Sequence, residues 1–136
     1  MKCIFCEIVE KKLSSRIIFE DAFTMAFLDI ADDVDGHTIV IPKKHVVNIF
    51  DCDSETLFRL INTVQFVSKH YVDDCGFKGV NLLNANGIEA QQSVSHFHIH
   101  IIPRIKNDNI DAWPVFGGSN QQIEEIWKKL RVYARK

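Results

Sequence analysis

The sequence predicts an α+β fold, an antiparallel sheet of about five strands with a long helix and a C-terminal helix packed on one face. Two patterns indicate this class. Short β-rich runs bounded by turn-forming residues recur along the chain, whereas segment 53–72 repeats its apolar residues at three- and four-residue steps. Because the chain has 136 residues, of which 46% are apolar and 25% charged, we expect residues 1–136 to form one globular domain.

Local signals define each predicted element. Ile4, Ile8 and Leu13 form a rough apolar stripe, which predicts a short N-terminal helix. Ser119 and Gln122 form a capping-box pair, which predicts the start of the last helix. We expect that helix to bury Ile123, Ile126, Trp127 and Leu130. The predicted elements in chain order are a helix over 4–13, strands over 16–20, 24–29 and 37–42, a helix over 53–72 that ends before Gly76, strands over 79–84 and 94–103, and the C-terminal helix.

The charge balance narrows the classes of function. Lys and Arg total 16 and Asp and Glu total 18, which gives a net charge of -2. A nearly neutral chain lacks the basic surface of proteins that bind nucleic acids or anionic membranes, so we expect neither partner. No apolar run reaches the roughly 18 residues of a membrane span, and Glu7 interrupts the start where a signal peptide is apolar. We therefore expect a cytoplasmic protein with reduced cysteines.

Three of the six histidines lie in the last predicted strand, within a stretch of five residues. Alternate residues of a strand share a face, so His96, His98 and His100 project together, opposite the apolar residues between them. They could ligate a metal, or one imidazole could attack an electrophile while its neighbours orient it or move protons. Spread over about 13 Å, the three cannot all reach one ion. An exposed polar face without a role is the remaining alternative.

A pair of cysteines lies near the N-terminus. Cys3 and Cys6 form a C-x-x-C pair, which is half of a tetrahedral zinc site. Taken alone the pair is a weak signal, because free buried thiols are its ordinary alternative.

Residues 92–102 (QSVSHFHIHII) resemble the signature of the histidine triad (HIT) family, His-φ-His-φ-His-φφ, where φ is apolar. The likeness continues in residues 3–6 (CIFC), 27–30 (FLDI) and 36–45 (GHTIVIPKKH), so the core motifs span 3–104. Residues 105–136 then form a C-terminal segment and helix. The chain most resembles the small bacterial Hit and Hint-like branch. That resemblance implies a homodimer that acts on nucleoside phosphoramidates or nucleotidyl anhydrides.

The resemblance also implies roles for single residues. His98 matches the nucleophile that attacks the α-phosphorus and forms a nucleotidyl-histidine intermediate, and His100 matches a residue on the phosphate and leaving-group side. Ser93 and Gln92 match two phosphate contacts, whose donors can stabilise negative charge. Asp29 matches the carboxylate that accepts hydrogen bonds from ribose hydroxyls.

Further positions are expected around the nucleotide. The residues matching the apolar walls of the base site are Ile4, Phe5, Leu13 and Phe27. Ala85 stands where many relatives carry an Asn that faces the phosphate, and its neighbour Asn86 is expected near the nucleotide. Gln91 and Ser95 also depart from the family pattern, where Gly and an aromatic residue are usual. The departures at Ala85 and Gln91 are expected to change the geometry of the phosphate site and to leave the nucleophile intact.

For the cysteine pair, the resemblance implies a structural zinc ion. The matching positions in the bacterial branch join Cys3 and Cys6 to His45 and His96, with His37 as a competing ligand. A zinc ion held there would leave His98 and His100 for chemistry and would not itself be catalytic.

The leading hypothesis is therefore a hydrolase or nucleotidyl transferase without a catalytic cofactor. It would cleave a P-N or P-O bond at the α-phosphate of a purine nucleotide that carries an AMP or GMP moiety. The alternative is a module that binds a purine nucleotide or a protein partner without turnover.

Overall fold

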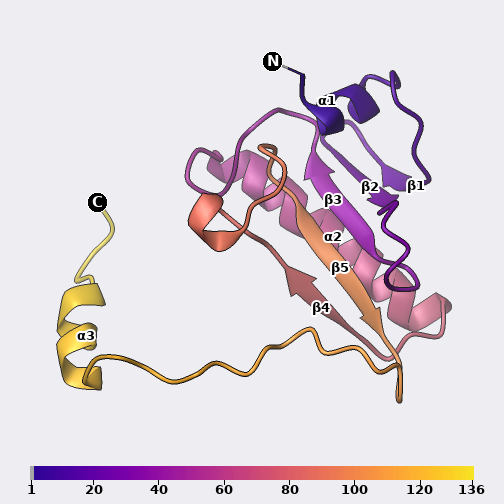
Figure 1. Cartoon of the computed structure of the whole chain (residues 1–136). Helices are drawn as coiled ribbons and strands as arrows, with labels where there is room; N and C mark the ends of the chain where they lie inside the picture. The colour runs from indigo at the N-terminus through magenta and orange to yellow at the C-terminus, as the bar shows by residue number, and fades with distance from the viewer. Residues whose placement is uncertain (1) are drawn as a thin grey trace.

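Five strands form one antiparallel sheet in the order β1-β2-β3-β5-β4, which confirms the predicted α+β class (Figure 1). The computed structural model describes residues 2–136. Its elements are α1 (Ile4–Val9), β1 (Ile17–Glu20), β2 (Thr24–Leu28), β3 (Thr38–Pro42), α2 (Ser54–Asp74), β4 (Gly79–Leu83), the short 3-10 helix η1 (Ile88–Ala90), β5 (Ile99–Arg104) and α3 (Ile123–Leu130). No helix in this part of the chain is both long enough and apolar enough to cross a membrane.

Helix α2 covers one face of the sheet (Figure 1). Its apolar stripe, which includes Leu60, Val64 and Val67, packs against Val40 of β3 and Ile101 of β5 to form the main core. The Asp53 side chain caps the N-terminus by accepting a hydrogen bond from the N–H of Thr56. After Cys75 the chain turns at Gly76, whose φ of +86° favours glycine, so the helix ends where predicted.

The prediction that all helices share one face is wrong, because α1 packs on the opposite face. Phe5 and Ile8 of α1 are buried against Phe27 of β2 and other strand residues in a second apolar cluster. The helix also ends earlier than the predicted Leu13, since Lys11 has a left-handed φ of +62°. Ile4 and Leu13 remain 47% and 40% exposed, so only Ile8 of the predicted stripe is buried.

Strand β5 is shorter than the predicted strand over 94–103. The register pairs Val40 with Ile99, so its continuation would place Pro42 opposite Phe97. Pro42 has no N–H to donate, and the N–H of Phe97 instead donates to the carbonyl of a loop residue at 2.8 Å. The first two histidines of the triad therefore precede the strand.

The predicted alternation of faces nevertheless holds through this irregular segment. Phe97, Ile99 and Ile101 point into the core beneath α2. The imidazoles of His96 and His98 lie on the side of α1, where both contact Phe5. One stretch of chain thus separates the apolar packing from the chemically active side chains.

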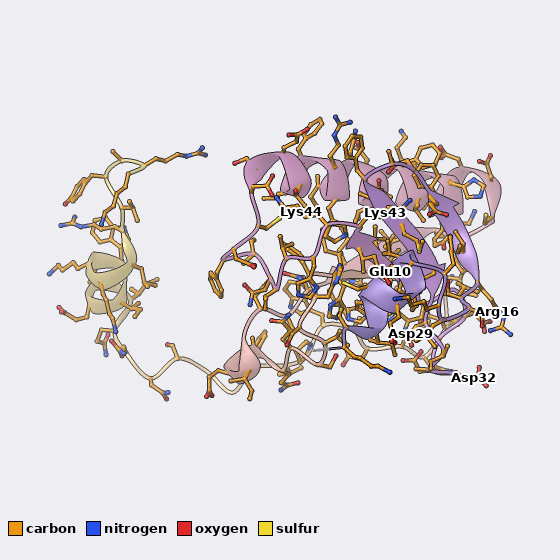
Figure 2. The ribbon with its side chains drawn as sticks, turned by 90° about the horizontal axis from the view of Figure 1, so that it is seen from above. Glu10, Arg16, Asp29, Asp32, Lys43 and Lys44 are labelled. Carbon is orange, nitrogen blue, oxygen red and sulfur yellow. The ribbon has the colours of Figure 1, made fainter. Side chains whose placement is uncertain are left out.

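The C-terminal helix does not bury its apolar face, contrary to prediction. Arg104 holds the start of this segment through Asp108 and the carbonyl of Ile110. Residues 111–136, here called the arm, then leave the body, and Figure 2 shows α3 standing apart from it. Gln122 caps α3 without a side-chain hydrogen bond, so the predicted capping box is absent from the described residues. The exposed apolar side chains of the arm include Trp113, Val115, Phe116, Ile123, Trp127 and Leu130, with Ile126 half-buried.

Candidate active site and metal centre

His98 lies at the centre of the candidate site, with its ring almost fully buried. Its Nδ1 lies 2.7 Å from the carbonyl oxygen of His96, an acceptor, so Nδ1 carries the hydrogen and Nε2 carries the lone pair. The ring also packs edge-on against Phe5, with 5.2 Å between ring centroids. The Asn84 amide donates to the carbonyl of His98 at 2.8 Å and fixes the backbone. These contacts hold one tautomer in one orientation.

The free nitrogen of His98 is accessible. In residues 2–136, Ser68 Oγ is the one buried side-chain polar atom without a hydrogen-bond partner. Nε2 of His98 has no protein partner in the same part of the chain, so it lies where solvent or a ligand can reach it. An oriented imidazole nitrogen with an accessible lone pair is a suitable nucleophile.

His100 belongs to a different group of side chains. Its Nδ1 lies 2.9 Å from Nε2 of His37, at the beginning of β3. Nδ1 of His37 contacts the Asp33 carboxylate at 2.9 Å, and Nε2 of His37 lies 3.5 Å from Oδ2 of Asp29. Burial, together with the neighbouring His98 and His37, lowers the pKa of His100 to about 4. His100 is therefore a neutral imidazole at pH 7.

A cavity of about 400 Å³ adjoins this group. Asp29, His37, Arg16 and Asp32 are among the residues that line it. Figure 2 labels Asp29, Arg16 and Asp32 on the same side of the body. Asp29 uses Oδ1 to accept the N–H of Ala31 at 2.8 Å. Its second oxygen faces the histidines and can accept a further hydrogen bond.

Cys3, Cys6, His45 and His96 bring one ligand atom each to within 4.8 Å of one another. Nδ1 of His45 and Nδ1 of His96 are 3.1 Å apart, and Cys6 Sγ lies 3.3 Å from the first and 3.6 Å from the second. A tetrahedral ion with zinc bond lengths separates two nitrogen ligands by about 3.3 Å and a sulfur–nitrogen pair by about 3.6 Å. Cys3 Sγ lies 3.4 Å from Nδ1 of His96, so each of the four side chains has a separation close to an edge of one such site.

The hydrogen bond of His96 agrees with a metal centre. Nε2 of His96 contacts the carbonyl oxygen of Pro42 at 2.8 Å, which places the hydrogen there and leaves Nδ1 free to ligate. Burial and the adjacent Cys3 raise the pKa of the Cys6 thiol to about 11. A bound dication would reverse this preference for the neutral thiol, because it stabilises thiolates directly. His37, the competing ligand in the sequence interpretation, contacts His100 instead.

The three polar residues predicted near the nucleotide, Gln92, Asn86 and Ser93, differ in their hydrogen bonds to the protein. The Gln92 amide is fully engaged: its oxygen accepts from Asn48 and Gly87, and its nitrogen donates to two carbonyls. Asn86 accepts from the N–H of Ile49 and donates to Asn84. A phosphate contact from either residue would have to replace one of these bonds. Ser93 is exposed, with no hydrogen-bond partner in the described residues.

The sequence interpretation missed three residues of the site: Asp33, His37 as a partner of His100, and Asn84. The register explains the His37 contact, because Ile39 lies opposite His100 and His37 shares a face with Ile39. A sequence shows which residues share a face of one strand. It does not show which residue lies diagonally across the sheet, so no local signal could have found this pair.

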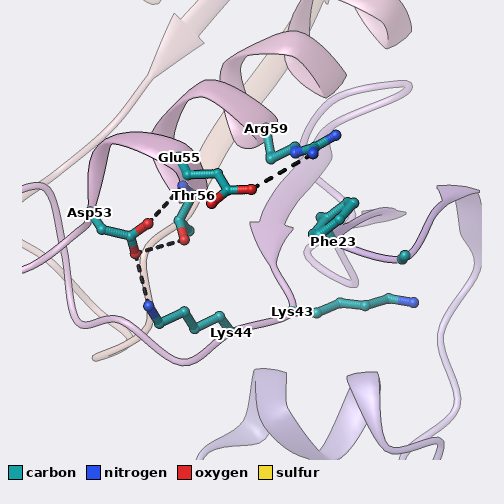
Figure 3. Close-up of a pocket in the computed structure, with 8 residues that line it drawn as sticks. Phe23, Lys43, Lys44, Asp53, Glu55, Thr56 and Arg59 are labelled. Carbon is teal, nitrogen blue, oxygen red and sulfur yellow. Dashed lines mark hydrogen bonds and ion pairs between the residues drawn. The ribbon is translucent and has the colours of Figure 1, made fainter.

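A separate cavity of about 260 Å³ lies between the turn before β2, the residues after β3 and the start of α2, and none of its lining residues is a histidine (Figure 3). Three cations border it, but each has a carboxylate partner. Lys44 binds Asp53 at 2.9 Å, Lys43 binds Glu20 at 2.6 Å, and Arg59 lies 3.7 Å from Glu55. With its charges compensated, this cavity offers no site for an anionic nucleotide.

Comparison with known proteins agrees with the histidine geometry. The family model described as HIT domain matches residues 10–107. The chain belongs to the HIT family. An adenosine 5'-monophosphoramidase of Schizosaccharomyces pombe is 36% identical over 138 residues, which cover 96% of this chain and 100% of that HIT protein.

Solved structures extend the comparison. A HIT family member from Bacillus subtilis superposes with a TM-score of 0.83 at 33% identity, covering 99% of this chain and 100% of that one. A zinc-bound histidine triad protein from Mycobacterium smegmatis has a TM-score of 0.76 at 33% identity, with 82% and 81% of the two chains covered. The family and the fold are therefore shown over most of the chain.

Proposed function

We propose that this protein is a nucleotide hydrolase or nucleotidyl transferase that cleaves a P-N or P-O bond at the α-phosphate of a purine nucleotide. The observation that carries the proposal is His98, whose Nδ1 contact with a carbonyl leaves Nε2 as an accessible lone pair. The named activity of the Schizosaccharomyces pombe relative supports an adenosine phosphoramidate as one substrate.

In the proposed reaction, Nε2 of His98 bonds to the α-phosphorus as the bond to the leaving group breaks. His100 faces the leaving group, and the free hydroxyl of Ser93 donates to the phosphate oxygens that gain negative charge. Water then attacks the phosphorus, breaks its bond to Nε2 and releases the nucleotide. No step requires a catalytic cofactor.

Nucleotide recognition is proposed at the adjoining surfaces. The second oxygen of Asp29 accepts hydrogen bonds from the ribose hydroxyls in this scheme. The AMP or GMP base packs on the half-exposed Ile4 and Leu13, while Phe5 and Phe27 support the site from beneath. Gln92 and Asn86 act near the phosphate mainly by fixing the loops around it.

The His98→Ala variant tests the proposed function. With adenosine 5'-monophosphoramidate as substrate, we expect kcat to fall by at least about 10³-fold and the covalent nucleotidyl adduct to disappear. AMP binding, measured by calorimetry, should persist. The matched control is His70→Ala, which removes an imidazole on α2 that binds Asp74 away from the site.

The alternative, a nucleotide-binding module without turnover, predicts a different result. The unmutated protein would then bind AMP but leave phosphoramidates, dinucleoside polyphosphates and adenylylated compounds intact. That outcome would contradict the hydrolase.

We further propose structural zinc at Cys3, Cys6, His45 and His96. The tetrahedral spacing of the four ligand atoms and the zinc-bound Mycobacterium smegmatis relative support this ion. Bound zinc would join α1 to the loop after β3 and to the segment before β5, and would supply no chemistry to the reaction. We place the protein in the cytoplasm, where a reducing environment preserves the thiols.

We also propose that residues 1–136 act as one HIT domain that forms a homodimer. Strand β4 is an unpaired edge of the sheet with Leu82 and Leu83 half exposed, and the arm presents apolar side chains without a partner in the body. A second copy could pair with β4 and cover both arms in one symmetric interface. The near-neutral net charge of -2 supports neither nucleic acid nor membrane as a partner.

A further inference from the structure

The loop between β4 and β5 holds a glutamine in a backbone conformation that favours glycine. Gln91 follows η1 with a φ of +67° and a ψ of 32°, which lie in the left-handed region. A side chain in this region costs free energy, because its Cβ approaches the following carbonyl oxygen. Of the other non-glycine residues with positive φ in residues 2–136, two are asparagines, which tolerate this conformation, and Lys11 binds Glu20 at 2.8 Å.

Within residues 2–136, the protein makes no use of the Gln91 side chain. Its carboxamide has no hydrogen-bond partner there, and the residue is exposed. The loop does use two N–H groups that could otherwise bind a phosphate. The N–H of Gln91 donates to the carbonyl of Ile88 at 3.0 Å, and that of Gln92 donates to Gly87 at 3.2 Å. Strain that nothing inside the protein offsets is typical of residues at functional sites.

The loop that carries Gln91 begins and ends at the candidate nucleophile. At its start, the Asn84 amide donates to the carbonyl of His98 at 2.8 Å. At its end, Ser93 opens the segment that leads to His98. Four hydrogen bonds of the Gln92 amide fix the chain between these points. Gln91 and Ser93 flank this fixed residue and are both exposed, so Gln91 is held next to the hydroxyl proposed to contact the phosphate.

We propose that Gln91 determines the specificity of the site for P–N over P–O bonds, through hydrogen bonds from its carboxamide to the reacting group. The carboxamide nitrogen donates to a phosphoryl oxygen, and the carboxamide oxygen accepts from the N–H of the leaving amine. This role rests on the proposed function and deepens it, because it names nucleoside phosphoramidates as the preferred substrate class.

The bridging atom distinguishes the two substrate classes. The nitrogen of a phosphoramidate formed from a primary amine or ammonia carries a hydrogen, so it can donate to the carboxamide oxygen. The bridging oxygen of a nucleotidyl anhydride carries none and presents only lone pairs. An acceptor that faces another acceptor loses the hydrogen bond that it makes with water. A side chain with one donor group and one acceptor therefore complements O=P–N–H and not O=P–O.

The test compares Gln91→Gly with Asn107→Gly, using adenosine 5'-monophosphoramidate and diadenosine triphosphate. Glycine suits the left-handed conformation at both positions, so both variants should fold, and Asn107 is exposed in the loop after β5. For Gln91→Gly we expect kcat/KM to fall about tenfold for the phosphoramidate and to change less than twofold for the triphosphate. Gln91→Asn, which keeps a carboxamide, should recover part of the loss. Asn107→Gly should match the unmutated protein.

Binding to His98→Ala separates failure of this role from failure of the proposed function. Without the nucleophile, calorimetry can compare intact adenosine 5'-monophosphoramidate with AMP methyl ester, which has the same charge but no N–H on the phosphorus substituent. We expect His98→Ala to bind the phosphoramidate about tenfold more tightly, and the added Gln91→Gly change to remove that preference.

Two results would overturn the role of Gln91: an equal effect of Gln91→Gly on the turnover of both substrates, or an unchanged binding preference in the double variant. An unmutated protein that turns over neither substrate contradicts the hydrolase instead. The binding preference then still decides whether Gln91 recognises the P–N bond.

Discussion

Among single residues, the triad histidines differ most in what binds their Nδ1 atoms. Nδ1 of His96 faces the two cysteines, Nδ1 of His98 contacts a carbonyl, and Nδ1 of His100 contacts a second imidazole. Each partner sets which nitrogen is free for other work. In the proposed function, three identical side chains at alternate positions therefore take three roles: His96 ligates zinc, His98 is the nucleophile and His100 faces the leaving group.

The buried imidazole of His100 makes stability depend on pH. Its pKa is about 4 in the folded protein and about 6.5 in an unfolded chain, so the unfolded state binds more protons between these values. Stability should therefore fall as the pH decreases from about 6.5 to about 4. In His100→Gln we expect a fall smaller by about 1–2 kcal/mol, allowing for solvent screening.

Urea titrations of both proteins at pH 7 and pH 4.5, each with the same metal content, would measure this difference. Equal losses of stability in the two proteins would contradict it.

At the scale of elements, α1 has few means of attachment to the sheet. It is six residues long, and only Phe5 and Ile8 of its side chains are buried. Isolated helices of this length are unstable in water, so tertiary contacts must hold it. The metal-ligand cluster adds two such contacts, because Cys3 caps the helix and Cys6 lies within it.

Cys3→Ala should consequently release both the metal and the helix. We expect zinc content to fall from one ion per chain to near zero and the free energy of unfolding to fall by about 3 kcal/mol, which lowers Tm by about 10 °C. Elemental analysis and calorimetry would measure both. Cys75→Ala is the matched control, since Cys75 is exposed and outside the cluster. Unmutated protein purified without metal would contradict the zinc proposal.

Most elements follow from local pattern, and the failures have physical causes. The first four strands and α2 were predicted within two residues at each end because turn residues and capping residues define them. The late start of β5 depends on Pro42, which is remote in sequence and would lie opposite Phe97 if the register continued. Likewise, the amphipathic pattern of α3 indicates an apolar face but cannot show that its partner lies outside the same chain.

For the site, the alternation of side chains along a strand predicted that the three histidines share a face. The family resemblance predicted the cluster of Cys3, Cys6, His45 and His96. The saturated amide of Gln92 was unpredictable, because its four partners come from three separate loops. Polar networks of this kind depend on where loops meet, which residue type and spacing do not encode.

For the whole molecule, the distinctive feature is the arm, which carries apolar side chains away from the body (Figure 1). Deletion of residues 111–136 should leave the sheet and its histidines folded, since α3 has no side chain buried against them. We expect the dimer dissociation constant to rise at least tenfold, because the deleted apolar surface would lie in the interface. Sedimentation equilibrium would measure it. An unchanged constant, or a monomeric unmutated protein, would contradict the arm's role.

Both tryptophans of the chain, Trp113 and Trp127, lie in the arm, with 76% and 53% of their surfaces exposed. The body that holds the sheet and the histidines contains none. Intrinsic tryptophan fluorescence therefore does not report on the sheet and reports only on the surroundings of the arm. A fluorescence melt of this protein will follow release of the arm, and unfolding of the sheet must be followed by circular dichroism.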